Sequence, residues 1–558
     1  MPRKGNGDAR RTLKVPMHGG MLERDRSVGW RTGPTRVPLS GETTDGGQGS
    51  LRGDSIQYGD RGGTIRRSEA LLAAMRRRLG HGRQNPRNYA LLAIFVLSAG
   101  GCSTVPDVDE EIAQATSTSS SRPLILGADG TLNVAQANRT LGNLASDAAT
   151  DALLERHLTV EQAVAGTPLT SGNATKLLRD GDGTFDAVFK AIAEARNHIN
   201  LEYYTLEDVE FSGHKLSELL LEKRRAGVAV NIIYDSYGSS NTPGDFFKEL
   251  ESAGVNLLAF HPVNPLEAVA EGYSPNDRNH RKIMIVDGRV AIVGGVNLAS
   301  YYQSKTPGDG SGPSGDAAEA EQAPQKGEPE DWRDMSIRIE GPAVAQLQGL
   351  FLGHWQSEGG PPLDQTGFYP KPRTAGDQII RIIGSSPQQD FSRYYVTLIS
   401  AIRSAEQRIW LTTAYFVPTF EEKHALIAAA ERGVDVRLML PAVSDASQAV
   451  AVAHSHYGDL LEAGVKIFEI EHVILHSKTV TIDGVWSAVG SSNFDHRSVL
   501  FNDEVEAIVL GRKTAHELEA VFEEDRAGAK EIKLEEWRKR PITDRVTDFF
   551  QRTLQHLL

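Results

Sequence analysis

Two stretches of the chain share one polar skeleton. The first, "NHRKIMIVDGRVAIVGGVNLASYY", covers residues 279–302, and the second, "LHSKTVTIDGVWSAVGSSNFDHRS", covers residues 475–498. Aligning His280 with His476 matches further pairs without a gap, each 196 residues apart: Lys282 and Lys478, Asp287 and Asp483, Gly288 and Gly484, Gly294 and Gly490, Asn297 and Asn493. The apolar residues between them differ, so the repeat preserves the residues that can do chemistry.

The histidine and the lysine of each copy stand two positions apart in an apolar run that predicts a strand. Side chains at i and i+2 leave a strand on the same face, so the two groups point together. An imidazole and an ammonium that converge suit a phosphate: the lysine neutralises an oxygen, and the histidine attacks phosphorus or protonates a leaving oxygen. Asn297 and Asn493 add neutral donors for the phosphate.

The acidic residues near the two copies are of two kinds. Asp287 and Asp483 belong to the repeated motif, and we group them with its catalytic residues, although their position at a turn favours a scaffold role. Asp334 and Glu504 open the matching segments "DMSIRIEG" and "EVEAIVLG". A nucleophilic histidine needs an acceptor on its other ring nitrogen. We therefore expect each of these two acids to lie beside the histidine strand of its own half and to orient that histidine.

Neither half alone holds both a nucleophile and a proton donor. Brought together about a pseudo-twofold, the halves surround one phosphate with two histidines, two lysines and two asparagines. One histidine then attacks to give a phosphohistidine, while the other protonates the leaving alcohol and next deprotonates the acceptor alcohol or water. We predict no metal and no cofactor, since the paired lysines supply the positive charge. His454 and His456 are interpreted as residues of a helix surface.

Helical patterns and apolar strand patterns alternate from residue 171 onward, and the same order returns in the second half. "RRAGVAVNII" is echoed by "AERGVDVRLM", and "LESAGVNLLAF" by "LEAGVKIFEI". A length of 558 residues allows two or three domains. The sequence therefore predicts an α/β fold built by internal duplication.

Charge is distributed unevenly along the chain. The total is −13, but residues 1–101 hold 18 Lys and Arg against 8 Asp and Glu, a net of +10, which leaves −23 on the remainder. So acidic a globular part argues against a general nucleic-acid binder, which needs a basic face. No run of 18 apolar residues predicts a membrane span.

The single cysteine, Cys102, ends the segment "MRRRLGHGRQNPRNYALLAIFVLSAGGC". Its basic start, short apolar run and small residues are typical of a signal peptide. It resembles a bacterial lipoprotein signal, which implies diacylation of Cys102 and a lipid anchor on the periplasmic side. Ser103 favours the outer membrane over the inner. Because a signal must begin the chain, we expect Met75 to be the biological start.

These patterns divide the chain into seven predicted segments. They are a disordered, over-extended start at 1–74, a lipoprotein-type signal peptide at 75–101, a tether at 102–170, a first domain at 171–360 with an insertion at 303–331, a linker at 361–380, a second domain at 381–536, and an amphipathic C-terminal helix at 537–558.

The paired motifs resemble the phospholipase D superfamily, whose signature is His-x-Lys-x4-Asp followed by a Gly/Ser-rich step and Asn. Both copies are complete, at 280–287 and 476–483. Segments such as "WRDMSIRIEGPAV", "GVDVRLMLPAVSD" and "GSSNFDHRSVLFNDEVEAIVL" are similar to bacterial cardiolipin synthases, over about Ser171 to Glu536. The resemblance implies two duplicated phospholipase D-like α/β/α sandwich domains packed about a pseudo-twofold, with the active site between them.

The same resemblance implies a chemistry. The enzyme would transfer a phosphatidyl group from one phosphatidylglycerol to the hydroxyl of another and release glycerol, working at a membrane surface without nucleic acid. It implies His280 and His476 as the catalytic pair, and analogy favours His280 as the nucleophile. A phospholipase D that uses water as the acceptor is the alternative, and a nuclease or an idle scaffold are further ones. Transfer requires a dry acceptor side, for which Tyr415, Phe416 and Pro418 are candidates. The oligomeric state is left open.

Overall fold

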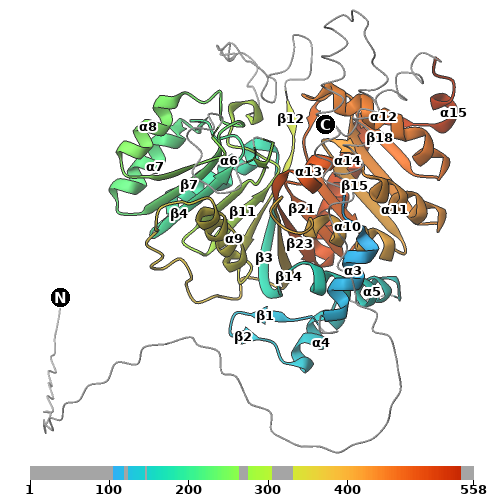
Figure 1. The fold of residues 1–558 in the computed structure, drawn as a ribbon, viewed down its shortest axis with the longest axis horizontal. Helices are drawn as coiled ribbons and strands as arrows, with labels where there is room; N and C mark the ends of the chain where they lie inside the picture. Colours follow the sequence, from blue (N-terminus) through green and yellow to red (C-terminus); the bar gives the residue numbers. More distant parts are fainter. Residues whose placement is uncertain are drawn as a thin grey trace, which may run out of the picture. The chain divides into compact units, whose positions relative to one another are not determined.

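The structure is a computed structural model that describes residues 105–118, 123–144, 148–262, 274, 276–303 and 331–541 (Figure 1). Several expectations fall outside these residues and stay predictions. They are the disordered start, the signal peptide, the lipidation site Cys102, most of the insertion at 303–331 and most of the C-terminal helix at 537–558.

The first half is a mixed β-sheet in which strands pair in the order β8, β7, β4, β10, β11, β13, β3. The first three run parallel, because helices make the crossovers between them, and the remaining pairs are antiparallel. The elements are β3 (Leu169–Arg179), α6 (Asp180–Glu194), β4 (His198–Tyr203), α7 (Leu216–Arg225), β7 (Ala229–Asp235), α8 (Gly244–Ser252), β8 (Asn256–Phe260), β9 (Arg278–Asn279), β10 (Ile283–Val286), β11 (Val290–Gly294), β12 (Trp332–Arg333), β13 (Met335–Glu340) and α9 (Val344–Ser357).

The second half repeats this topology strand for strand, in the order β18, β17, β15, β20, β21, β23, β14. Its elements are β14 (Gln378–Ser385), α10 (Arg393–Ser404), β15 (Arg408–Thr413), α11 (Phe420–Glu431), β17 (Asp435–Pro441), α12 (Ser447–Glu462), β18 (Lys466–Ile470), β19 (Ile474–Leu475), β20 (Lys478–Ile482), β21 (Trp486–Gly490), β23 (Asn502–Leu510), α14 (Arg512–Gly528), β24 (Lys530–Ile532) and α15 (Leu534–Trp537). The predicted α/β duplication is confirmed.

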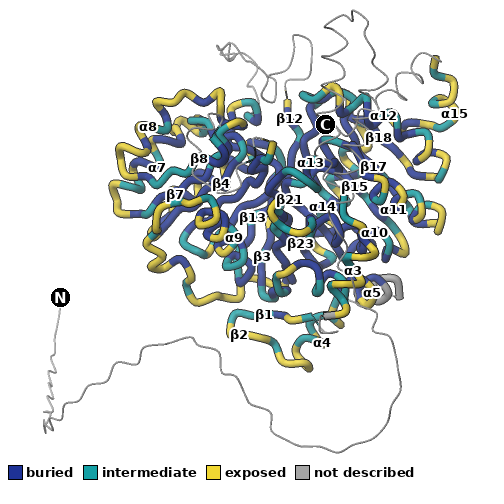
Figure 2. The backbone as a smooth tube through the Cα atoms, viewed as in Figure 1, coloured by how far each residue is buried: buried dark blue, intermediate teal, exposed yellow. Residues whose placement is uncertain are grey.

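The two sheets join at their matching edges. β3 and β14 pair antiparallel through Thr170–Asn173 and Gln378–Ile380, so the strands of both halves run on as one sheet (Figure 1). Two helices cover this junction: α9 packs on β10 and β11 and reaches β14, while α14 packs on β20 and β21 and reaches β3. Their apolar faces share one core with strands of both halves. Figure 2 shows the strands buried and the outer faces of the helices exposed.

The segment expected to be a tether, residues 102–170, is in its described part integral to the second half. Helices α3 (Val108–Thr118) and α5 (Ala148–Val164) pack on α10, and Val108 and Leu158 enter the core. Glu161 at the end of α5 pairs with the buried Arg381 at 2.8 Å. Burial raises the pKa of Glu161, but the charge of Arg381 and the bonds from His157 and Trp486 outweigh it and bring the pKa to about 2. Helices that bury such groups are fixed parts of the second half and do not act as a flexible tether.

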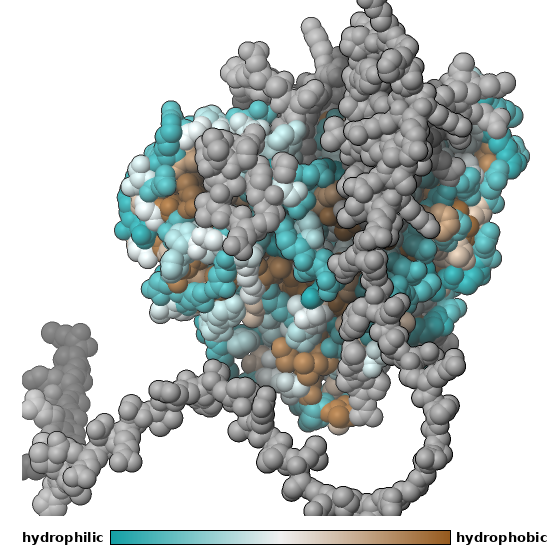
Figure 3. Space-filling model, in the orientation of Figure 1, coloured by the Kyte–Doolittle hydropathy of each residue, from teal (hydrophilic) through white to brown (hydrophobic). Residues whose placement is uncertain are grey.

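The remaining described elements are small. They are β1 (Ile125–Gly127), β2 (Gly130–Thr131), α4 (Val134–Gly142), β5 (Glu210–Phe211), β6 (His214–Lys215), η2 (Ser300–Tyr302), β16 (Phe416–Val417), β22 (Phe494–Asp495) and α13 (His496–Leu500). On the face seen in Figure 3, hydrophilic residues cover most of the described surface. Five large hydrophobic side chains are exposed among the described residues: Leu124, Val134, Tyr237, Tyr369 and Phe420.

The start of α11 buries a carboxyl group. Thr419 caps the helix by accepting from the Glu422 amide at 3.2 Å, and Glu422 returns a bond by accepting from the Thr419 amide at 2.8 Å. Glu422 is almost wholly buried, and burial raises its pKa to about 8. The folded protein therefore keeps a proton on Glu422 at neutral pH that the unfolded chain releases.

We predict that Glu422→Gln stabilises the protein increasingly as the pH rises from about 4.5 to above 8. Over this range the wild type loses stability, since its raised folded pKa favours the protonated form, whereas glutamine stays neutral and still caps Thr419. Thermal unfolding from pH 5 to pH 9 should show the midpoint difference between variant and wild type growing by roughly 3 °C or more. For Glu421→Gln, a half-buried neighbour on the same turn, the difference should stay flat. A flat difference for Glu422→Gln would contradict the expectation.

Candidate active site

Two short parallel ladders cross between the halves and carry the histidines. β9, which ends directly before His280, pairs with the first residues of β23, and β19, which ends directly before His476, pairs with β12. The His280 amide donates to the Asp503 carbonyl at 2.9 Å, and the His476 amide donates to the Arg333 carbonyl at 2.8 Å. Each histidine is therefore fixed on the backbone of the opposite half.

The exchange of strands also exchanges the acids. His280 Nδ1 lies 3.0 and 3.1 Å from the two carboxylate oxygens of Glu504, and His476 Nδ1 lies 2.8 Å from Asp334 Oδ2. Both acids contact histidine Nδ1 as expected, but the expectation that each serves the histidine of its own half was wrong. The physical reason is the parallel ladder: it sets Asp503 beside Asn279, so the next residue, Glu504, faces the next residue, His280.

The His280 and Glu504 pair holds a full negative charge on the carboxylate. Burial raises the pKa of Glu504, but His280, Lys282 and a hydrogen bond from Ser491 outweigh it and bring the pKa to about 2. Burial is the main cause that lowers the pKa of His280 to about 4, against the opposing attraction of Glu504. His280 is thus a neutral imidazole at neutral pH with Nδ1 engaged, which leaves Nε2 for chemistry.

The His476 and Asp334 pair is electrostatically different. Burial raises the pKa of Asp334 to about 7 in spite of Lys478. Burial and then the charge of Lys478 hold the pKa of His476 well below its ordinary range. The Tyr302 hydroxyl also lies 2.8 Å from His476 Nδ1, and Trp332 lies against the imidazole with ring centres 5.4 Å apart. The second motif copy has Ser498 at the position of Tyr302, so the repeat did not single out this aromatic residue.

The two lysines are buried beside their histidines. Lys282 Nζ donates to the His280 carbonyl at 2.9 Å, and Lys478 Nζ donates to the His476 carbonyl at 2.5 Å and lies 2.7 and 3.0 Å from the His476 ring nitrogens. Lys282 is 1 % exposed and Lys478 is 4 % exposed. Two enclosed ammonium groups against one firmly ionised carboxylate make a region that suits a phosphodiester anion.

Each of the two asparagines has a buried polar atom without a hydrogen-bond partner among the described residues. Asn297 Oδ1 accepts from the Thr205 amide at 3.1 Å, while its buried Nδ2 has no protein partner among the described residues. Asn493 is buried too, and its Oδ1 is likewise unpartnered there. A buried donor without a partner is costly, so Asn297 fits a site that is completed by an acceptor such as a phosphate oxygen.

Asp287 and Asp483 serve the scaffold. The Asp287 carboxylate accepts from the amides of Arg196, Asn197 and His198 at 2.7 to 3.0 Å as its best distances. Asp483 does the same in the second half, for the amides of residues 406–408. Each stands five residues beyond its lysine, about 16 Å along the strand. Grouping them with the catalytic residues is therefore corrected: they fasten the hairpin to the preceding helix–strand turn.

Arg281, between the histidine and the lysine, faces away from them and joins the halves. From the first half it bonds three groups of the second: the Glu504 carbonyl at 3.1 Å, the Asp503 carboxylate at 3.0 Å and the Ser385 carbonyl at 3.0 Å. It also pairs with Glu202 at 3.4 Å. This role was not predicted because the second copy has Ser477 at this position, so the repeat does not single Arg281 out.

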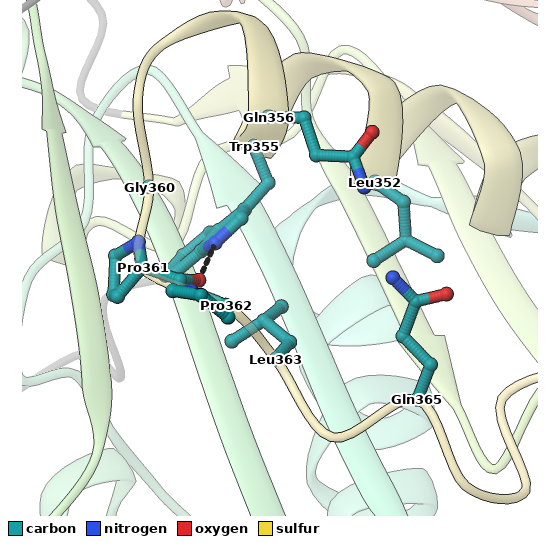
Figure 4. Close-up of a pocket in the computed structure, with 8 residues that line it drawn as sticks. All are labelled: Leu352, Trp355, Gln356, Gly360, Pro361, Pro362, Leu363 and Gln365. Carbon is teal, nitrogen blue, oxygen red and sulfur yellow. Dashed lines mark hydrogen bonds between the residues drawn. The ribbon is translucent and has the colours of Figure 1, made fainter.

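Among the described residues, two hollows outside the histidine pair can be compared with it. One, of about 270 Å³, lies at the end of α9 and the loop after it, where Trp355 Nε1 donates to the Pro361 carbonyl at 2.8 Å and the lining side chains carry no titratable group (Figure 4). The other, of about 30 Å³, is lined in part by Tyr204, whose ring lies 5.5 Å from that of His280. The described residues contain no group of three or more His, Cys, Asp or Glu that would hold a metal.

One minor expectation also changes. His456 is 3 % exposed and so is not on the surface of α12. His454 is partly buried and bonds Glu469 at 2.8 Å. Neither residue contacts the site residues in any bond seen among the described residues, so both serve the packing of the second half.

Comparisons with known proteins agree with this geometry. The family model described as "Cardiolipin synthase, PLD-like domain" matches residues 188–304 and 398–526, one match in each half. Cardiolipin synthase 1 of Bacillus cereus is 33% identical over 414 residues, covering 72% of this chain and 76% of that protein. Cardiolipin synthase of Geobacillus kaustophilus is 34% identical over 393 residues, covering 70% and 74%. The solved phosphatidylserine synthase of Haemophilus influenzae shares the fold, with a TM-score of 0.50 at 12% identity, covering 71% of this chain and 98% of that one.

We predict that Arg281→Leu lowers the free energy of unfolding by about 3 to 5 kcal/mol, because it removes the guanidinium that pairs with the buried Asp503 carboxylate at 3.0 Å and leaves His354 as the remaining cationic partner of Asp503 and Glu202. Arg281→Lys should fall between this variant and wild type, since lysine keeps the charge but loses the planar fork. Arg338→Leu, whose partner Glu340 is exposed, is the control and should cost less than about 1 kcal/mol. Denaturant unfolding measures all three. Equal losses of unfolding free energy for Arg281→Leu and Arg338→Leu would contradict the role of Arg281 in joining the two halves.

Proposed function

This chain belongs to the cardiolipin synthase family of the phospholipase D superfamily and is a phosphatidyltransferase; we propose that it moves a phosphatidyl group from one phosphatidylglycerol to a hydroxyl of another and releases glycerol. The observation that carries the proposal is the pair of buried histidines, each bonded through Nδ1 to an acid of the opposite half and each beside a buried lysine. This arrangement suits one phosphate held between two histidines in opposite roles.

His280 is the nucleophile in this proposal. Its Nε2 attacks phosphorus while the bond from phosphorus to the glycerol oxygen breaks, which gives a phosphohistidine. The ionised Glu504 at Nδ1 supports this role, because it stabilises the positive charge that the ring gains when it attacks. Lys282, Lys478 and Asn297 hold the non-bridging oxygens of the phosphate.

His476 carries the proton. It protonates the departing glycerol oxygen and then removes a proton from the incoming hydroxyl, whose oxygen displaces Nε2 of His280 from phosphorus. Burial and then the charge of Lys478 hold the pKa of His476 down. Binding of the lipid phosphate opposes the Lys478 charge, so the substrate itself favours the protonated imidazole. Asp334 orients the ring through Nδ1.

The substrate implies a membrane surface as the working place. No described helix combines the length and apolar character needed to cross a bilayer. We propose that diacylation of Cys102 anchors the protein on the periplasmic side, on the strength of the basic, apolar and small-residue order before Cys102. In this proposal Ser103, after the lipidated cysteine, favours the outer membrane over the inner.

Lipid mass spectrometry tests the reaction. The full chain in detergent is given phosphatidylglycerol, and cardiolipin, glycerol and phosphatidic acid are followed for wild type and His280→Ala. We expect cardiolipin and glycerol in equal amounts from wild type, and a loss of at least about 1000-fold in the variant. Phosphatidic acid without cardiolipin would instead identify a hydrolase that uses water.

A phosphatidyl p-nitrophenyl ester tests the roles of the two histidines. Its phenolate departs without a proton donor, so His476→Ala should still release one equivalent of p-nitrophenol per site and then stall as the phosphohistidine. His280→Ala should release none. Rapid-mixing absorbance measures the burst, and the acid-labile adduct is located by peptide mass spectrometry. A burst from His280→Ala and none from His476→Ala would reverse the assignment.

A further inference from the structure

A polar pair of the second half lies beside His476. Tyr415 follows β15, and its ring stands edge-on to the imidazole with centres 6.1 Å apart. The Tyr415 hydroxyl donates to Asp445 Oδ2 at 2.7 Å, and Asp445 lies in the loop between β17 and α12. The Ser444 hydroxyl donates to the other oxygen, Oδ1, at 2.9 Å. The carboxylate is therefore held in one orientation close to the proton-carrying histidine, and it is only partly buried.

A carboxylate here does not serve the phosphate. It repels an anion, and it accepts hydrogen bonds without donating any. It lies near enough for its charge to raise the pKa of His476, against the burial and Lys478 charge that hold this pKa down. The group that Asp445 suits is a neutral donor, and among the parts of the substrate the donors are the hydroxyls of the glycerol head group.

The two halves differ at this point. The corresponding loop of the first half, residues 236–243, contains no acidic residue. Two acidic side chains lie near that loop. Asp235, directly before it, is wholly buried and accepts from the amides of Tyr237, Gly238 and Asn279. Glu207 accepts from both the amide and the hydroxyl of Ser300 at 2.8 Å. The repeat therefore preserves the phosphate machinery in both halves but places an oriented carboxylate beside His476.

We propose that Asp445, oriented by Tyr415, binds a free hydroxyl of the glycerol group and makes the site selective for a polyol alcohol. The inference rests on the proposed function. In-line attack by His280 puts the leaving oxygen on the opposite side of phosphorus, which is the side of His476 and Asp445. The acceptor enters where glycerol left, so one carboxylate recognises both alcohols.

Alcohol competition tests the inference. The full-length enzyme, in detergent with phosphatidylglycerol as donor, receives equal concentrations of deuterated glycerol and 1-propanol. Labelled phosphatidylglycerol and phosphatidylpropanol are counted by mass spectrometry. Wild type should favour glycerol. Asp445→Asn should lower the ratio of glycerol product to propanol product about tenfold, as expected for the loss of a hydrogen bond to a charged group. The shared first step, in which glycerol leaves the donor, affects both products alike and cancels in this ratio.

Two variants sharpen the comparison. Tyr415→Phe keeps the ring against His476 and should lower the ratio by about threefold, since the carboxylate loses one anchor. Asp459→Asn, on the neighbouring helix, removes a carboxylate that pairs with Lys423 and should leave the ratio unchanged. If Asp445→Asn lowers both products equally, Asp445 acts through His476 or the fold, and the inference is overturned. If wild type forms neither product, the proposed phosphatidyl transfer is contradicted, and so is the inference that rests on it.

Discussion

The two short parallel ladders that cross the seam, β9 with β23 and β12 with β19, are the constraint on which the site depends. Each is two residue pairs long, yet each fixes a histidine amide on the carbonyl of the other half and brings the next residue, an acid, to that histidine. Neither histidine has its acid without the other half. The site therefore exists only when both halves are folded and docked, and the continuous sheet through β3 and β14 keeps them docked.

The duplicated backbone positions two histidine–acid pairs that differ in their electrostatics. The same strand order positions both histidines, but the surrounding side chains differ in kind: Ser491 donates to Glu504 and helps to keep it ionised, whereas Gly295 stands at the matching place beside Asp334. A Cβ at Gly295 would come within 2.2 Å of the Asp334 carboxylate, so that position has no room for a serine. One carboxyl is thus firmly charged and the other is not. Opposite roles in one reaction need such a difference.

The sequence predicted those candidate site residues that both copies of the repeat keep. The histidines, lysines and asparagines were identified because two copies in register keep them, and the α/β topology followed from alternating patterns. Strand periodicity assigns side chains to faces but does not say which domain a short strand will pair with, so Asp334 and Glu504 were given to the wrong histidines. Arg281 and Tyr302 were missed because each occurs in a single copy. Packing of α3 and α5 on the second half was likewise not predicted, since an apolar stripe on a helix does not indicate which surface it packs against.

The residues on the acceptor side of the site bear on how transfer outcompetes hydrolysis. An apolar, closed wall was the expectation, with Tyr415 as one of its parts. Phe416 is indeed buried, but the Tyr415 hydroxyl points its hydrogen bond at a carboxylate rather than at an apolar neighbour. A carboxylate attracts water as readily as alcohol, so exclusion alone does not explain selectivity on this side. Water can occupy the carboxylate or attack phosphorus, but one molecule does not do both, whereas a polyol bound through one hydroxyl presents another to His476. Selectivity then comes from positioning the attacking oxygen.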